Sequence, residues 1–354
     1  MASRPTTKAV FKLITYRPLH PYNGSPRALL TSHSRPYSSS FTNNNINNSQ
    51  PIIIRSDIPA PHTGHIRILE LNRPSARNAI SRALLSSLAH EITDIATQYD
   101  PSSGAEVPKP PKFGGAAGPN KRGHTRALVL ASAVDESFCA GADLKERKSM
   151  SQEETADFLS NLRGTLAALE GLQIPTISAI SSMALGGGLE VALATTFRVL
   201  ASTATVGLPE TRLGIIPGAG GTYRLPALIG VGRARDLVLT GRRVGAAEAY
   251  FIGIADRLVE VLPEEDERTA VMGDKEQGKV LLGQARKAAL SEAVRLAQEI
   301  CEGGPVAIRA GLKAVSYARP EVEDQMYQRV VNSEDKHEAL AAFREKRKPV
   351  FKGR

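Results

Sequence analysis

The sequence predicts an α/β protein whose strands pair mainly in parallel. Short apolar segments with strand character alternate with segments of helical periodicity between residues 65 and 229. Glycine-rich turns or capping residues precede several of the helical segments. With 354 residues the chain can bury a full core, in one large domain or two. Local propensity does not separate a doubly wound sheet from a spiral of ββα turns.

The expected elements follow one another along the chain. Residues 65–71 alternate as a strand does, and apolar residues at helical spacing predict a helix over about 79–98. The sequence Ser-Gln-Glu-Glu at 151–154 predicts a capping box that opens another helix. The other expected elements are strands at 126–132, 174–183 and 197–201, helices from 187 and over 222–229, and a helical pattern from about 285 with a new segment at Pro305.

The positive charge of the chain is concentrated at its N-terminus. The formal net charge is +9, but residues 1–56 hold seven Lys and Arg and no Asp or Glu, which leaves +9 − 7 = +2 for the rest. An acid-free leader rich in Arg and Ser is typical of a mitochondrial presequence. We therefore predict a presequence over residues 1–37, cleaved after Tyr37, and import into the mitochondrial matrix. The alternative is a disordered basic tail on a cytosolic protein.

Composition divides the remainder of the chain. Residues 38–59 are predicted to be a disordered linker, residues 60–262 the core, and residues 287–354 a C-terminal helical region. A loop rich in Pro and Gly at about 100–125 and a charged stretch at 263–286 are predicted insertions. No segment is apolar and long enough to predict a membrane span. The two cysteines form no CxxC and the seven histidines are scattered, so neither a metal site nor a disulfide framework is predicted.

Two glutamates lie next to segments that would bring backbone close to a ligand. Glu190 ends the run ALGGGLE, and Glu210 lies just before the glycine-rich segment at 214–222. A carboxyl group beside apolar residues favours its neutral form, and two such groups close together can divide the roles of acid and base. The alternative is structural, because a glutamate in the first turn of a helix complements the helix dipole. A third segment at 137–147 supplies a loop of small residues that a ligand can approach.

At these segments the chain resembles the enoyl-CoA hydratase/isomerase (crotonase) superfamily. The resemblance covers roughly residues 60–354, apart from the two insertions. It implies a crotonase-like α/β spiral of ββα units with a C-terminal helical region used in trimerisation, in a homotrimer or a dimer of trimers. The matching stretches are LNRPSARNAI (71–80), FCAGADLKER (138–147), PTISAISSMALGGGLEVALATTFRVLA (175–201), VGLPETRLGIIPGAGGTYRLP (206–226) and AAEAYFIGIADRLVE (246–260).

The resemblance also implies the roles of individual residues. The substrate would be an acyl-CoA thioester, and the backbone N–H groups of Ala142 and Gly187 would form the oxyanion hole. Glu190 would deprotonate water, and Glu210 would supply the proton to the α-carbon. Ala142, Asp143, Leu144, Lys145 and Gly187 would contact the substrate, although Asp143 could equally be a helix cap. No metal or separate cofactor is implied, because no redox step occurs and coenzyme A belongs to the substrate.

A finer similarity points to one branch of the family. CAGADLKER, ALGGGLE and AFREKRKPVFKG resemble the methylglutaconyl-CoA hydratases, which implies hydration of 3-methylglutaconyl-CoA to 3-hydroxy-3-methylglutaryl-CoA in leucine degradation. Arg147 is a candidate partner for the distal carboxylate of that substrate, because of its position near the site loop. A basic cluster at 346–348 could reach a CoA phosphate or be a solvated tail.

Two alternatives stay open. The first is a general short-chain enoyl-CoA hydratase or an enoyl-CoA isomerase of fatty-acid oxidation, although many isomerases keep only one of the two acidic residues. The second is an RNA-binding protein, because a related hydratase uses a lysine-rich face of its first helix. Here that helix shows Arg82, Ser86 and His90 instead, and a charge near +2 does not predict strong phosphate-driven binding.

Overall fold

The computed structural model describes residues 50–108, 123–263 and 273–354 of the chain. All of them belong to one compact unit, Ser49–Arg354. The predicted presequence at 1–37 and the first part of the predicted linker, up to residue 49, lie outside the described residues.

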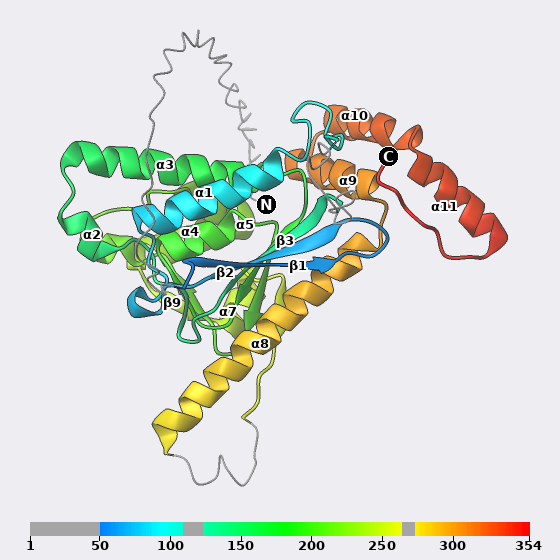
Figure 1. The fold of residues 1–354 in the computed structure, drawn as a ribbon. Helices are drawn as coiled ribbons and strands as arrows, with labels where there is room; N and C mark the ends of the chain where they lie inside the picture. The colour runs from blue at the N-terminus through cyan, green and yellow to red at the C-terminus, as the bar shows by residue number, and fades with distance from the viewer. Residues whose placement is uncertain (1–49, 109–122, 264–272) are drawn as a thin grey trace, which may run out of the picture. The chain divides into compact units, whose positions relative to one another are not determined.

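Two sheets organise this unit (Figure 1). In the larger sheet every neighbouring pair is parallel except the first, β1 with β2. In the smaller sheet only the last pair, β8 with β9, is antiparallel. In spatial order the larger sheet contains β1 (Ile53–Pro59), β2 (His65–Leu71), β3 (Thr125–Ser132), β5 (Thr176–Ile180), β7 (Phe197–Ala201) and β10 (Arg257–Val259), and the smaller contains β4 (Ser137–Cys139), β6 (Met183–Leu185), β8 (Thr205–Gly207) and β9 (Arg243–Gly245).

Three successive repeats form the central part of both sheets. The pairs β3–β4, β5–β6 and β7–β8 each place one strand in the larger sheet and the next in the smaller, and helical segments follow each pair. This is a spiral of ββα units, so the predicted fold class is confirmed. The helical segments are η1 (Pro74–Ala76), α1 (Arg82–Ala96), α2 (Leu144–Lys148), α3 (Gln152–Glu170), α4 (Gly187–Leu193), η2 (Pro209–Leu213), α5 (Gly221–Ile229), α6 (Val231–Thr240), α7 (Ala246–Ile252), α8 (Asp274–Cys301), α9 (Pro305–Tyr317), α10 (Pro320–Val331) and α11 (Glu334–Glu345).

Both faces of the larger sheet are covered. All eight residues of β3 are buried, and they alternate between two cores: Leu128 and Leu130 pack into one, Val129 into the other. The second core is closed by α8, which lies across that face of the sheet through Ala285, Ala289 and other small residues (Figure 1). A parallel sheet buried on both sides needs such continuous apolar strands. The first core holds α1 and α3, which lie side by side (Figure 1).

Several local predictions are confirmed. The strand at 65–71 has those bounds, and the capping box at Ser151 is formed with Glu154, which opens α3. The predicted helix over 79–98 is α1, capped by the Ser81 side chain. The predicted strand over 174–183 is two strands, because the chain bends at Ser181 and Ser182 and moves from one sheet to the other.

Two predicted boundaries are wrong. The predicted linker at 38–59 ends too late, because Ile53–Pro59 is strand β1 and pairs antiparallel with β2 along its whole length. The predicted charged insertion at 263–286 also ends too late, since α8 begins at Asp274. The first turns of α8 are exposed and rich in charged residues, so their composition resembles that of a solvated loop. Residues 264–272 lie outside the described part of the chain.

Over residues 50–108, 123–263 and 273–354, every helix is too short or too polar to cross a bilayer. Within the same ranges, no three His, Cys, Asp or Glu side chains are grouped as metal ligands would be. Both cysteines are buried thiols. Burial raises the pKa of Cys139 to about 12, so this side chain is a packing residue and not a nucleophile.

Candidate active site

Two separate elements bring Glu190 and Glu210 to the same place. Glu190 lies in the first turn of α4 and its N–H donates to Gly186 O at 3.0 Å. Glu210 lies in η2, and a Cβ at Gly186 would sit 2.9 Å from its Oε1. Gly186 also has a positive φ of 53° and donates its N–H to Gly207 O at 2.9 Å, which ties β6 to β8. The backbone of Glu190 and the carboxyl group of Glu210 therefore both adjoin Gly186 at the end of the smaller sheet, and the charge of Glu190 acts on Glu210.

Glu190 is held from behind by a glycine-rich loop. Its side chain is buried, and Oε1 accepts hydrogen bonds from Ala219 N–H at 2.7 Å and Gly221 N–H at 2.9 Å. Burial raises the pKa of Glu190, while these two N–H groups and the charges of Arg224 and Arg163 act against that rise. The glycine run at 218–221 is therefore a wall of the site. It orients one carboxylate oxygen, and no protein donor among the described residues bonds to the other.

Glu210 is buried with fewer partners. Its Oε2 is buried and has no hydrogen-bond partner among the described protein atoms. Burial, followed by the nearby charge of Glu190, raises the pKa of Glu210 to about 7, against the effect of its own backbone N–H. A carboxyl group in this state is about half protonated at neutral pH, so it can donate a proton or accept one.

Two backbone N–H groups lie beside the glutamates. Ile80 bonds to the residues on either side of Ala142, by Ile80 N–H to Gly141 O at 2.7 Å and Asp143 N–H to Ile80 O at 3.1 Å. In such a parallel bridge the N–H of the central residue points away from its neighbour strand. The other donor, Gly187, begins α4, so its N–H has no acceptor within the helix. A Cβ at Gly187 would lie 3.7 Å from the Ala142 nitrogen.

These two donors are free to bind a ligand. Within the described part of the chain, no hydrogen bond uses the N–H of Ala142 or of Gly187. Gly188 allows the start of α4 to pack closely against β4, because a Cβ there would lie 2.1 Å from Cys139 O. The triple glycine thus serves close backbone packing as well as access. Two N–H groups that can point at one oxygen have the form of an oxyanion hole.

The remaining predicted contact residues are more peripheral. Asp143 caps α2, because its Oδ1 accepts from Lys145 N–H at 3.2 Å and Glu146 N–H at 3.3 Å, and its Oδ2 pairs with Arg73 at 3.1 Å. Partial burial raises the pKa of Asp143, but the Glu146 N–H and Arg73 outweigh it and the net shift is downward. Leu144 and Lys145 are exposed. Their contact with substrate stays a prediction.

The C-terminal basic cluster is less available than its sequence suggests. Arg347 bonds to Glu338 Oε2 at 2.9 Å and to Glu345 Oε2 at 2.6 Å. Lys346 and Lys348 flank it and are exposed. The central charge of this cluster is therefore engaged in ion pairs on the C-terminal helix.

Sequence reasoning missed the residues that hold the glycine-rich loop. Arg224 is buried on α5, and its Nη1 donates to Ala219 O at 2.9 Å while Nε and Nη2 donate to Glu170 Oε2 at 3.1 and 2.7 Å. Arg163 on α3 donates through Nε to Gly218 O at 2.6 Å. The available signal was the position of Arg224 on the buried face of α5, together with Gly221 and Leu225. A buried arginine at such a position needs partners.

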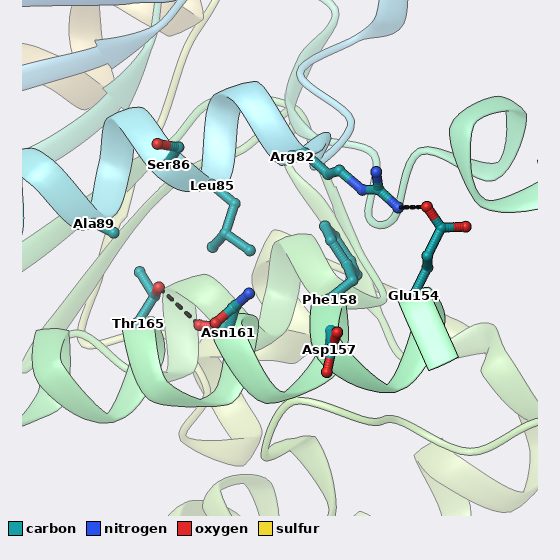
Figure 2. A pocket seen from close by; sticks show the side chains of 9 residues that line it. All are labelled: Arg82, Leu85, Ser86, Ala89, Glu154, Asp157, Phe158, Asn161 and Thr165. Carbon is teal, nitrogen blue, oxygen red and sulfur yellow. Dashed lines mark hydrogen bonds and ion pairs between the residues drawn. The ribbon is translucent and has the colours of Figure 1, made fainter. Parts of the chain in front are cut away.

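A groove between α1 and α3 lies apart from this site (Figure 2). An ion pair between Arg82 and Glu154, 3.0 Å long, closes one end of it, and Phe158 and Leu85 form its apolar floor. Neither catalytic candidate lines the groove.

Known proteins share this fold and these segments. The sequence profile described as enoyl-CoA hydratase/isomerase matches residues 120–354. Methylglutaconyl-CoA hydratase 1, mitochondrial, of Pyricularia oryzae is 65% identical over 308 residues, covering 86% of this chain and 88% of that protein. Enoyl-CoA hydratase domain-containing protein 2, mitochondrial, of Homo sapiens is 36% identical over 304 residues, covering 84% and 88%.

Solved structures agree with this match. The crystal structure of enoyl-CoA hydratase from Bacillus anthracis superposes with a TM-score of 0.67 at 36% identity, covering 86% of this chain and all of that chain (100%). The chain belongs to the enoyl-CoA hydratase/isomerase family and is an enzyme of that family.

Proposed function

We propose that this enzyme adds water across the double bond of a 2-enoyl-CoA thioester, with 3-methylglutaconyl-CoA as substrate and 3-hydroxy-3-methylglutaryl-CoA as product. The observation that carries the reaction type is the pair of buried glutamates beside two unused backbone donors. The substrate is supported by the 65% identity to a protein named methylglutaconyl-CoA hydratase.

The geometry supports the following mechanism. The thioester oxygen binds between the N–H groups of Ala142 and Gly187. Glu190, oriented by its two backbone donors, takes a proton from water while the water oxygen bonds to C3. The electrons of the double bond move toward the thioester, whose oxygen gains charge that the two N–H groups stabilise. Glu210, protonated in part near neutral pH, gives its proton to C2, and the C–H bond completes the hydration.

A hydration assay tests this proposal. Purified enzyme is given crotonyl-, longer 2-enoyl- and 3-methylglutaconyl-CoA, and the loss of the conjugated double bond is followed. We expect the highest kcat/KM with 3-methylglutaconyl-CoA. An enzyme that hydrates crotonyl-CoA efficiently and ignores 3-methylglutaconyl-CoA contradicts the substrate assignment and leaves a general enoyl-CoA hydratase.

An isomerase is the second candidate on this fold. It moves a double bond and needs no water, so one carboxyl group can suffice. Retention of both Glu190 and Glu210 in one apolar site favours the hydratase. Product analysis in deuterated water distinguishes the two, because hydration yields a hydroxyl-bearing product and isomerisation does not.

We also propose that the enzyme works in the mitochondrial matrix. The acid-free leader and the relatives named mitochondrial support this location. Sequencing of the organelle protein is expected to give a mature N-terminus at Ser38, and a mature chain that begins near Met1 would contradict it.

A trimer or a dimer of trimers is the expected assembly. Large apolar side chains on the C-terminal helices are exposed in the single chain, with Val315 on α9 at 79% and Phe343 on α11 at 84%. Such exposure supports burial against another copy. The mass of the purified protein by light scattering tests this assembly.

RNA binding is not part of the proposal. Arg82 on α1 is paired with Glu154, and Asp157 adds a second acidic group along the neighbouring groove (Figure 2). Phosphate-driven binding needs an unpaired basic face. We expect no retention of AU-rich RNA at physiological salt.

A further inference from the structure

Two arginines place positive charge near the catalytic carboxyl groups. Arg224 on α5 and Arg163 on α3 are cations whose charges act on Glu190, and Glu210 on η2 is the neighbouring carboxyl group. A carboxylate brought in by a substrate would be the third carboxyl group in the site, beside the two glutamates. Without a cation beside it, an anion in such a place is strongly disfavoured.

Arg224 cannot serve as that cation. It is buried, and its Nε, Nη1 and Nη2 all donate hydrogen bonds, to Ala219 O and to Glu170. A Cβ at Gly220 would lie 2.1 Å from its Nη1, so the guanidinium is packed directly against the loop. Binding a substrate would require Arg224 to leave these partners.

Arg163 has donors to spare. Its Nε donates to Gly218 O at 2.6 Å, and Gly218 is its one hydrogen-bond partner among the described residues. Its two Nη groups are therefore free of protein acceptors in the described part of the chain. Leu159, one turn earlier on α3, packs against the same loop, because a Cβ at Gly218 would lie 3.3 Å from its Cδ2. This face of α3 is distinct from the one that borders the groove with Asn161 and Thr165 (Figure 2).

The mechanism fixes the direction of the acyl chain. Its carbonyl lies at Ala142 and Gly187, and C3 lies beside Glu190. Glu190 is bonded to Ala219 and Gly221, and Gly218 precedes them in the same loop, so Arg163 lies against the loop that holds the carboxyl group facing C3. In a methylglutaconyl group the distal carboxyl carbon is only two bonds beyond C3.

We propose that Arg163 is the residue that determines specificity for a 2-enoyl-CoA with a distal carboxylate. Its Nη groups donate to that carboxylate while Nε keeps its bond to Gly218 O. A guanidinium suits this task because it can present two donors side by side to one carboxylate. This inference rests on the proposed function and names the residue that recognises the substrate.

Arg163 is a better candidate than Arg147, which the sequence suggested. Arg147 lies in α2, and its backbone N–H bonds to Asp143 O at 2.9 Å. Among the described residues, no hydrogen bond joins the Arg147 side chain to the glycine-rich loop that Arg163 contacts. Arg147 therefore provides a matched control.

The test compares two substrates that differ only in the distal carboxylate. Wild-type enzyme, Arg163→Met, Arg163→Lys and Arg147→Met are assayed with 3-methylglutaconyl-CoA and 3-methylcrotonyl-CoA. We expect Arg163→Met to lower kcat/KM for 3-methylglutaconyl-CoA roughly 10- to 100-fold more than for 3-methylcrotonyl-CoA, as loss of a charged hydrogen bond predicts. Arg163→Lys should restore part of the preference, and Arg147→Met should keep all of it.

The two possible failures are separable. If Arg163→Met loses equal activity on both substrates, Arg163 only holds the loop and the inference is wrong. The inference is equally wrong if Arg163→Met keeps the wild-type preference. A wild-type enzyme without any preference for the carboxylate-bearing substrate would instead overturn the proposed substrate, whatever the variants do.

Discussion

The two carboxyl groups of the site differ in how the protein surrounds them. Glu190 has one oxygen fixed by two backbone N–H groups of a loop that Arg163 and Arg224 anchor. Glu210 lies on a 3-10 turn, with a buried oxygen that has no protein donor among the described residues. One carboxyl group is thus supported by donors that favour its ionised form, and the other is not.

This difference assigns the chemistry. The donors at Glu190 suit a base that must hold a negative charge before water adds. Burial and the charge of Glu190 raise the pKa of Glu210 to about 7, which suits an acid. Two glutamate side chains can therefore take opposite roles because the protein surrounds their carboxyl groups differently.

The largest effect is expected from removing either charge. We expect Glu190→Gln and Glu210→Gln each to lower kcat by roughly 100- to 10,000-fold, as loss of a general acid or base does. Circular dichroism and the oligomeric mass should be unchanged. Near-wild-type turnover in either variant would show that the site needs only one carboxyl group.

The second-largest fall in kcat is expected from blocking the oxyanion donors. A Cβ at Gly187 would lie 3.1 Å from Ile80 Cδ1 and beside the Ala142 nitrogen. We expect Gly187→Val to lower kcat roughly 100- to 1000-fold, as loss of one such donor does, and to weaken CoA binding. Gly232→Val on α6 is the control, since a Cβ there meets nothing within 4 Å. Equal activity of the two variants would remove Gly187 from the site.

A smaller fall in kcat is expected when the loop that bonds to Glu190 loses an anchoring residue. Arg224→Met removes the bond to Ala219 O, and we expect kcat to fall roughly 10- to 100-fold through misplacement of Glu190. It also removes a charge that lowers the pKa of Glu190, so the acidic limb of the pH–rate profile should move to higher pH. Arg242→Met removes a surface arginine from exposed ion pairs and serves as the control. A lower rate with an unmoved acidic limb would mean that Arg224 positions Glu190 without changing its pKa.

The smallest effect concerns stability. The pKa of Glu210 is raised from 4.5 to about 7 on folding, so the folded state binds more protons between these values. The free energy of unfolding therefore falls as pH rises from 4.5 to 7, and the loss is complete above 7. Glu210→Gln removes this loss. We expect it to raise the free energy of unfolding at pH 8, relative to pH 5, by roughly 1–3 kcal/mol in urea titrations. An equal difference from wild type at both pH values would contradict it.

Much of the site could be predicted from the sequence. The triple glycine before Glu190 and the glycine run after Glu210 indicate where backbone comes close, and the structure brings both glutamates to Gly186. Alternating strands and helices predict the α/β class, but the division of each repeat between two sheets depends on pairing between distant strands. That pairing followed from the family resemblance and not from local propensity.

Other features were not predictable in this way. The linker and the insertion were assigned too long because composition does not show whether a polar or charged segment has a partner. Ile53–Pro59 is ordered as a strand because it pairs with β2. The exposed first turns of α8 belong to a helix whose later turns cover the larger sheet. The bond from Arg163 to Gly218 joins residues 55 positions apart, and the bond from Arg224 to Glu170 joins residues 54 positions apart. The spacing of apolar residues does not predict contacts over such separations.

The protonation of Glu210 is the most direct test of the difference between the two glutamates. Infrared spectra of wild type, Glu210→Gln and Glu190→Gln, recorded from pH 5 to pH 9, would follow the C=O stretch of a protonated carboxyl group. We predict one wild-type band that titrates with a pKa of about 7, is absent from Glu210→Gln and titrates at lower pH in Glu190→Gln. A wild-type spectrum without a protonated carboxyl group near neutral pH would contradict the account.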